Sequence, residues 1–222
     1  MGSIRAAATD FLGNSWRLLV ANVVWGIALV VLLGATAISP LAWLLAPLLA
    51  LPTVGIYRVA ALIVRGEPVS VRDGFDAWRR FGGRAIVVGA LLLGCLAIFA
   101  TNLVTGIQNS GVVGWSLATF AGWGLVATAI VSSVVWPLLV DPWRERLRLR
   151  DVLRLTSLLA LAFPLRFGAL AVVLVLLVAL STFAVVVVLS IAIGFAALVA
   201  CRYVLPAADR LLPPADPPDP AP

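Results

Sequence analysis

The sequence has no histidine and no lysine, and it has only two cysteines among 222 residues. Histidine is a common general base and metal ligand, so its absence removes the usual centre of acid–base and metal chemistry. Cys95 and Cys201 each stand alone in an apolar run, where free cysteine behaves as a small hydrophobic residue. We therefore expect no disulfide, no metal site, no cofactor and no enzymatic activity, since no set of catalytic residues or phosphate-binding loop is found either.

Charge is also scarce. Charged residues make up 12% of the chain and hydrophobic residues 63%, whereas a soluble domain has about 25% and about 45–50%. A soluble core cannot use so much apolar surface, but a lipid bilayer can, because each spanning helix needs roughly 20 apolar residues. The composition predicts an all-α, polytopic membrane helix bundle with the lipid bilayer as a partner.

Six apolar runs are long enough to be transmembrane helices. The last uncharged stretch, 167–201, would be about 50 Å long as a single helix, so we expect a hairpin that turns near 181–188. All the runs belong to one predicted domain, 1–212. The predicted spans are 16–38, 41–64, 85–106, 113–140, 166–184 and 187–206.

Charges fall on alternate connections between these spans. The connections after spans 2 and 4 are rich in arginine, while the other three carry no charge. Cytoplasmic connections carry the excess of basic residues in membrane proteins. Both termini and the two arginine-rich loops are therefore predicted to be cytoplasmic, in a multi-pass protein of the bacterial inner membrane. Juxtamembrane arginine also explains the net charge of +6 without a nucleic-acid partner.

The two ends of the chain have features of their own. Ala35-Thr36-Ala37 resembles a signal-peptidase site, and cleavage there would leave five spans. The apolar stretch before it is long for a signal peptide, which favours a retained helix. At the other end, six prolines within 213–222 predict a short disordered tail.

The first arginine-rich loop has a helical pattern. Ser70 and Asp73 have the spacing of a capping box, and Phe75 and Trp78 follow at helical spacing with arginines on other faces. This pattern predicts a short amphipathic helix on the cytoplasmic leaflet, which would be either a docking surface or an interfacial anchor. The candidate docking residues of the two loops are Arg72, Asp73, Phe75, Trp78, Arg79, Arg80, Arg148, Arg150 and Asp151.

The second loop partly repeats the first. Leu149-Arg150-Asp151 repeats Val71-Arg72-Asp73, and in each loop an arginine later opens the next span. The pattern suggests a parallel internal repeat, although shared topology alone could also produce it.

Few polar residues lie inside the predicted spans, and none is an Asp or Glu near the middle. Coupled carriers usually keep such a group, because an intramembrane charge is expensive and is retained for function. The candidates for an intramembrane polar site are Asn22, Arg58 and Asn102. We expect the asparagines to form interhelical hydrogen bonds. Arg58 is expected to snorkel to the interface or, alternatively, to pair with Asp141 or Asp73.

Short motifs in the first part of the chain carry a family resemblance. Asn22-Val23-Val24-Trp25, Leu51-Pro52-Thr53-Val54-Gly55 and Arg65-Gly66-Glu67 resemble the YesL-like family of small bacterial membrane proteins. The resemblance covers about residues 11–90, and Ile56 stands where that family often has proline. Several members of the family resemble accessories of sugar importers of the ABC type.

The resemblance implies a non-enzymatic accessory of solute or carbohydrate transport. Such a protein would dock a membrane transporter complex through its cytoplasmic loops. The alternative is a self-contained small-solute transporter or channel, with a path near Asn22, Asn102 and the two prolines that interrupt the second span, Pro47 and Pro52.

Overall fold

The structure is a computed structural model that describes residues 2–109, 111–182 and 191–213. All regular secondary structure within these residues is helical, which confirms the all-α prediction for the described part of the chain. The helices are α1 (Gly2–Gly13), α2 (Ser15–Ile38), η1 (Pro40–Leu49), α3 (Ala50–Arg65), α4 (Val71–Gln108), α5 (Val112–Val140), η2 (Pro142–Arg144), α6 (Leu149–Ala162), α7 (Pro164–Thr182) and α9 (Ile193–Leu211).

Four described helical segments are long and apolar enough to cross a membrane, so the chain is a multi-pass membrane protein. They are α2, η1 together with α3, α4 and α5. The pair α6–α7 makes a fifth if it is counted as one broken span, although the two helices meet at an angle of 102°. The predicted turn near 181–188 and the start of the sixth span, 187–206, lie largely outside the described residues. Six spans and cytoplasmic termini therefore stay predictions, and the predicted tail also lies outside the described residues from position 214 onward.

The second span is not one regular helix. Its first half, η1, is a 3-10 helix that contains Pro47, and α3 follows with Pro52 in its first turn. Proline lacks the N–H that an α-helix needs and clashes with the preceding turn, so the α-helical pattern begins only where these residues allow it. The interruption predicted near the two prolines is confirmed.

The start of α4 corrects one prediction. A short loop helix was expected to precede a separate span at 85–106, but one continuous helix of 38 residues runs through both. The predicted capping box does open it, because the Ser70 N–H donates to the Asp73 carboxylate at 2.7 Å and the Ser70 hydroxyl accepts from the Arg72 N–H at 3.2 Å.

Packing explains why α4 does not break between the loop and the span. Gly82 lies against Leu51 of α3, and a Cβ at this glycine would come within 3.0 Å of the leucine side chain. Phe81 and Ala85, on either side of it, are buried. The glycine therefore permits close contact between two helices, and the burial around it holds the backbone helical.

The second arginine-rich loop contains α6, which the sequence analysis did not delimit. Val152, Leu155 and Leu159 are buried at helical spacing along one face. Pro164 then ends the helix, because proline disfavours the α conformation in the residue before it. Phe163 accordingly has φ −133° and ψ 57°, and the chain bends sharply into α7.

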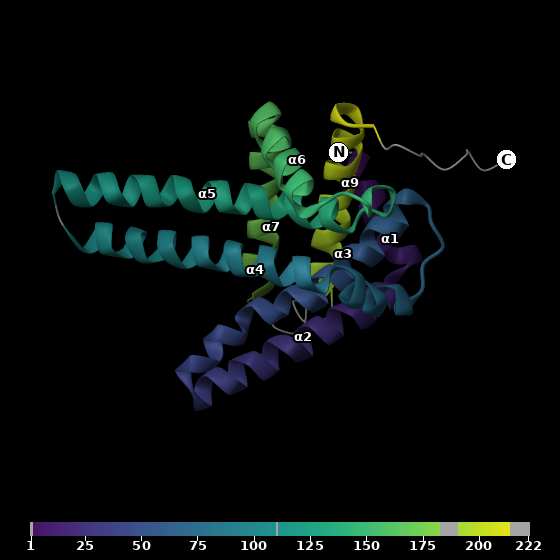
Figure 1. The fold of residues 1–222 in the computed structure, drawn as a ribbon, viewed down its shortest axis with the longest axis horizontal. Coiled ribbons are helices and arrows are strands. Elements are labelled where there is room, and N and C mark those ends of the chain that lie inside the picture. Colours follow the sequence, from purple (N-terminus) through teal and green to yellow (C-terminus); the bar gives the residue numbers. More distant parts are fainter. Residues whose placement is uncertain (1, 110, 183–190, 214–222) are drawn as a thin grey trace.

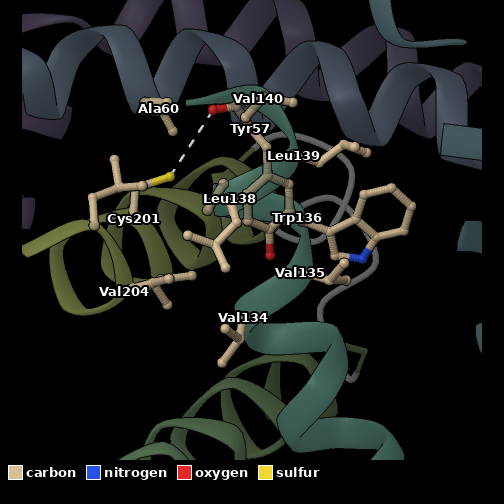
Figure 2. Packing of buried hydrophobic residues seen from close by; sticks show 14 of the residues in the cluster. Tyr57, Ala60, Val134, Val135, Trp136, Leu138, Leu139, Val140, Cys201 and Val204 are labelled. Atoms are coloured by element: carbon tan, nitrogen blue, oxygen red, sulfur yellow. Dashed lines mark hydrogen bonds between the residues drawn. The ribbon is translucent and has the colours of Figure 1, made fainter. Parts of the chain in front are cut away.

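The α2–η1 hairpin and the α4–α5 hairpin meet at one end of the molecule and diverge from it (Figure 1). The buried core lies where α3, α5 and α9 come together, around Tyr57, Trp136 and Cys201 (Figure 2). The α4–α5 hairpin projects from this core, and only 11% of the most apolar stretch of α4 is buried within the protein. One end of the molecule holds connections 66–70 and 141–148 together with the C-terminal end of α9. We call this end of the molecule the charged base.

Candidate functional site

The charged base contains a group of two arginines and two aspartates, three of which are almost closed to solvent. Asp141 is fully buried, and the side chains of Arg65 and Arg144 are 5% and 3% exposed. Asp209, at 27%, forms the outer edge. These four residues, which we call the buried ion cluster, come from the ends of α3, α5 with η2, and α9.

Each aspartate is shared between the two guanidinium groups. Arg65 donates to both oxygens of Asp141, at 3.0 and 2.7 Å, and to both oxygens of Asp209, at 2.7 and 3.1 Å. Arg144 approaches Asp141 at 2.6 Å and Asp209 at 2.7 Å. It also donates to the carbonyl of Leu212 at 2.7 Å, at the end of α9. Two positive and two negative charges therefore balance inside the protein.

The surroundings of the buried ion cluster give it a structural role. The Arg65 guanidinium lies 3.7 Å from the centroid of the Trp143 ring, a stacking contact that suits the planar group. Burial alone would raise the pKa of Asp209. Hydrogen bonds from Arg65 and Arg144 lower this pKa by more, so that it lies below its ordinary value. The charged groups are engaged with one another, so the cluster fixes three helix ends in position.

Arg58 lies beside this cluster and corrects its prediction. Its guanidinium donates to the carbonyl of Val140 at 2.8 Å and forms an ion pair with Glu145. The side chain is 11% exposed, so the guanidinium is engaged within the protein, by the connection that follows α5. Its carboxylate partner is Glu145, whereas sequence reasoning named Asp141 and Asp73. Glu145 follows the η2 turn, whose course the sequence did not reveal.

The first group of candidate docking residues lies in the opening turns of α4. Arg72, Phe75, Arg79 and Arg80 are exposed there. Asp73 is occupied by the helix cap. Four of these side chains are therefore accessible to a partner or to lipid headgroups.

Trp78 differs from its neighbours. It is half-buried and packs toward α3, where a Cβ at Gly55 would come within 2.8 Å of its indole nitrogen. The nitrogen is buried and has no hydrogen-bond partner within the described part of the chain. The position favours a packing role for Trp78 over the predicted docking role.

The second group of candidates lies at the start of α6, where Arg148, Arg150 and Asp151 are all exposed. Two contacts bring the loops together behind them. Arg80 approaches Glu145 at 3.4 Å, and Arg84 donates to the carbonyl of Leu147 at 3.0 Å. The two loops therefore form one continuous surface on the charged base.

The intramembrane polar candidates do not form a common site. The Asn22 side chain is fully buried and its oxygen accepts a hydrogen bond from the Gly194 N–H at 2.9 Å. This contact joins α2 to α9, as predicted for an interhelical hydrogen bond. Asn102 is half-buried in the part of α4 nearest the α4–α5 turn, far along the helix from the charged base. Arg58 lies in the base itself.

Two open grooves flank Trp136, with volumes of about 310 and 510 Å³. Both are lined mainly by apolar side chains, and Pro47 borders the smaller one. Thr53 lines both, but its hydroxyl donates to the carbonyl of Leu49 at 2.7 Å and accepts from the Trp25 indole at 3.0 Å. Ser132 also lines both grooves, but the other lining side chains are mainly apolar, so the grooves suit an occupant that is mainly apolar.

Sequence reasoning missed the buried ion cluster as a unit. All four residues were counted as loop or tail charges; in addition, Arg65 belonged to a motif of the family resemblance and Asp141 was named as a partner for Arg58. One signal was present, because Asp141 directly follows a long apolar run and precedes Pro142, which places a carboxylate at a helix end. Within the described residues no group of three His, Cys, Asp or Glu side chains could hold a metal ion.

Comparison with known proteins gives no relative: no family model, curated protein or solved structure matches the chain. The resemblance of residues 11–90 to the YesL-like family therefore stays a prediction.

Proposed function

We propose that this chain is a non-enzymatic accessory protein of the bacterial inner membrane, which docks a second membrane protein through the arginine surface of its charged base. The observation that carries the proposal is an imbalance between buried and exposed charge. The acids of the base are largely used within the fold, whereas many arginines face outward. The exposed arginines of the two loops are Arg72, Arg79, Arg80, Arg146, Arg148, Arg150 and Arg154.

The ion pairs explain how this imbalance arises. Asp141 and Asp209 balance Arg65 and Arg144, and Glu145 pairs with Arg58. Apart from Asp73, which caps α4, the described loops near the seven exposed arginines have only Glu67, Asp76 and Asp151 as further acids, and Asp76 lies 3.7 Å from Arg72. A surface with one dominant sign of charge attracts and orients a partner of opposite charge.

The class of partner rests on the sequence resemblance. If the YesL-like motifs reflect common descent, the partner is the membrane subunit of a solute or carbohydrate importer. An acidic cytoplasmic segment on that subunit would complement the arginine surface. Phe75, which is 44% exposed among these arginines, would add an apolar anchor of the kind that dominates many interfaces.

A charge-reversal experiment tests the docking proposal. The double variant Arg72→Glu/Arg79→Glu should no longer co-purify an importer subunit after solubilisation in a mild detergent. The matched control, Arg72→Lys/Arg79→Lys, keeps the charge and should retain the partner. Because both positions are exposed, neither double variant should change the circular dichroism spectrum. Equal recovery of the subunit with both double variants would contradict docking through this surface.

A second candidate is a self-contained transporter. The groove of about 310 Å³ beside Pro47 favours it, because interrupted helices often border transport paths. The hydrogen bond of Asn22 to Gly194 counts against it, since this polar residue is occupied in holding α2 to α9. Solute flux into vesicles that contain this chain alone would support the transporter. If there is no such flux, and the chain co-purifies with an importer, docking is supported.

A further inference from the structure

A third groove lies between α4 and α5 and is bordered at its base end by α6. Its volume is about 330 Å³, and Val88 of α4, Val135 of α5 and Leu153 of α6 line it together. Its one hydroxyl side chain, Thr128, donates within its own helix to the carbonyl of Gly124 at 2.8 Å. The groove therefore offers an apolar surface without a free polar side chain.

The length and position of this groove match an acyl chain. Its α4 wall extends from Val88 to Phe99, about 17 Å at 1.5 Å per residue. This length is roughly half of the 30 Å hydrocarbon thickness, and so about one leaflet. Both walls belong to helices that are apolar and long enough to cross a membrane.

Arginine marks the base end of the same groove. Arg84 lies four residues before Val88, and Leu91 and Cys95 lie three and seven residues after Val88. At this helical spacing all four residues share one face of α4. The Arg84 guanidinium donates to the carbonyl of Leu147 and forms no ion pair with a carboxylate of the described residues. Most of its donors therefore remain available.

α6 supplies a second cation at the base end of the groove. Leu153 lines the groove, and Arg150 lies one helical turn before it, exposed and without an ion pair among the described residues. Farther along α6, Leu158 and Leu161 are 50% and 79% exposed. The outward stripe of this helix thus changes from arginine to leucine along its length, as expected where a helix passes from headgroups into hydrocarbon.

We propose that the α4–α5 groove binds one anionic phospholipid, with an acyl chain along the groove and its phosphate between Arg84 and Arg150. An amphiphile with an anionic head matches both halves of the site. A neutral helix would leave the arginines unmatched, and a free phosphate would leave the groove empty. Arginine recognises phosphate through strong, charge-assisted hydrogen bonds, and basic sites between spanning helices bind anionic headgroups. Arg150 also belongs to the arginine surface of the docking proposal, but the docking test changes only Arg72 and Arg79, so the two proposals can fail separately.

Native mass spectrometry of the full-length protein tests the site. The protein, stripped of lipid in detergent, is titrated with phosphatidylglycerol and with phosphatidylcholine of identical acyl chains. We expect one phosphatidylglycerol to bind at least about tenfold more tightly than phosphatidylcholine, because only the former has net negative charge. Equal affinity for the two lipids would overturn the proposal.

Variants locate the two halves of the bound lipid. Arg84→Gln and Arg150→Gln should each reduce phosphatidylglycerol affinity about tenfold, the value expected for a lost charge-assisted hydrogen bond. Arg72→Gln, an exposed arginine on the docking surface, should leave it unchanged. Ala127→Phe, at an exposed position on the groove wall, should reduce the affinity for both lipids by filling the groove.

Three results would overturn the assignment. First, if Arg72→Gln weakened lipid binding as much as Arg150→Gln, the lipid would be responding only to total surface charge. Second, if Ala127→Phe left lipid binding unchanged, the acyl chain would lie elsewhere. Groove occupation by a second copy or by a partner segment would appear as added protein mass in place of lipid mass. Because Arg150 and Ala127 are exposed, their variants should fold even if Arg84→Gln does not, and circular dichroism checks this.

Discussion

Arginines of two kinds share the charged base and differ in what faces them. Arg65 and Arg144 are buried, and each contacts the same two aspartates, Asp141 and Asp209. The arginines on the docking surface and on α6 are exposed, and their ion pairs are few and solvent-facing: Arg72 lies 3.7 Å from Asp76 and Arg80 lies 3.4 Å from Glu145. Both kinds lie next to the ends of apolar helices, where arginine commonly fixes membrane topology.

The difference shows that a position beside a span does not decide what an arginine does. The deciding feature is a carboxylate on another helix end that reaches the same place. Asp141 ends α5 and Asp209 lies in the last turns of α9, so both meet Arg65 at the end of α3. Arginines without such an opposing helix end stay free for headgroups or partners.

Removal of the shared carboxylate should have the largest effect. Asp141→Asn keeps the side-chain shape but leaves Arg65 and Arg144 with less negative charge in a buried place. Breaking a buried ion pair in this way costs about 3–5 kcal/mol of unfolding free energy. SDS-induced unfolding in mixed micelles, followed by circular dichroism, measures the loss.

The matched control is an aspartate of the exposed kind. Asp76→Asn removes the ion pair with Arg72. The Asp76 side chain is 43% exposed and the Arg72 side chain is 85% exposed. This variant should cost less than about 1 kcal/mol, because solvent screens an exposed pair. Equal losses for the two aspartate variants would remove the distinction between buried and exposed charge.

Local patterns accounted for much of the fold. The apolar run predicted at 113–140 corresponds to α5, which begins one residue earlier, because hydrophobic residues continue up to the two polar boundaries. The capping box was also readable, since both of its partners lie within four residues. The bend before α7 was missed, although Pro164 carries the signal for it.

The buried ion cluster could not be read in the same way. Arg65 is separated from Asp141 by 76 residues and from Asp209 by 144, and only packing of three helix ends brings them together. In a single sequence each of these residues looks like an ordinary loop charge. The exposed arginines were easier to identify as candidate docking residues, because exposure next to a span needs no tertiary partner.

Arginine chemistry itself should matter only in the buried set. Arg65→Lys keeps the positive charge but loses the paired hydrogen bonds to Asp141 and the stacking on Trp143. These losses should cost about 1–3 kcal/mol in the same unfolding measurement. Arg80→Lys, at a side chain that is 62% exposed, should change stability by less than about 0.5 kcal/mol. A larger effect at Arg80 than at Arg65 would reverse the comparison.

The smallest expected effect is a pH dependence at the outer edge of the buried ion cluster. Hydrogen bonds from Arg65 and Arg144 hold the pKa of Asp209 below its ordinary value despite burial. The folded protein therefore favours the carboxylate, and this contribution is complete above the unfolded pKa of about 3.9. It disappears as the pH falls through the lower folded pKa. Wild type should lose thermal stability more steeply than Asp209→Asn below about pH 4, and parallel pH profiles for the two proteins would show that Asp209 contributes nothing.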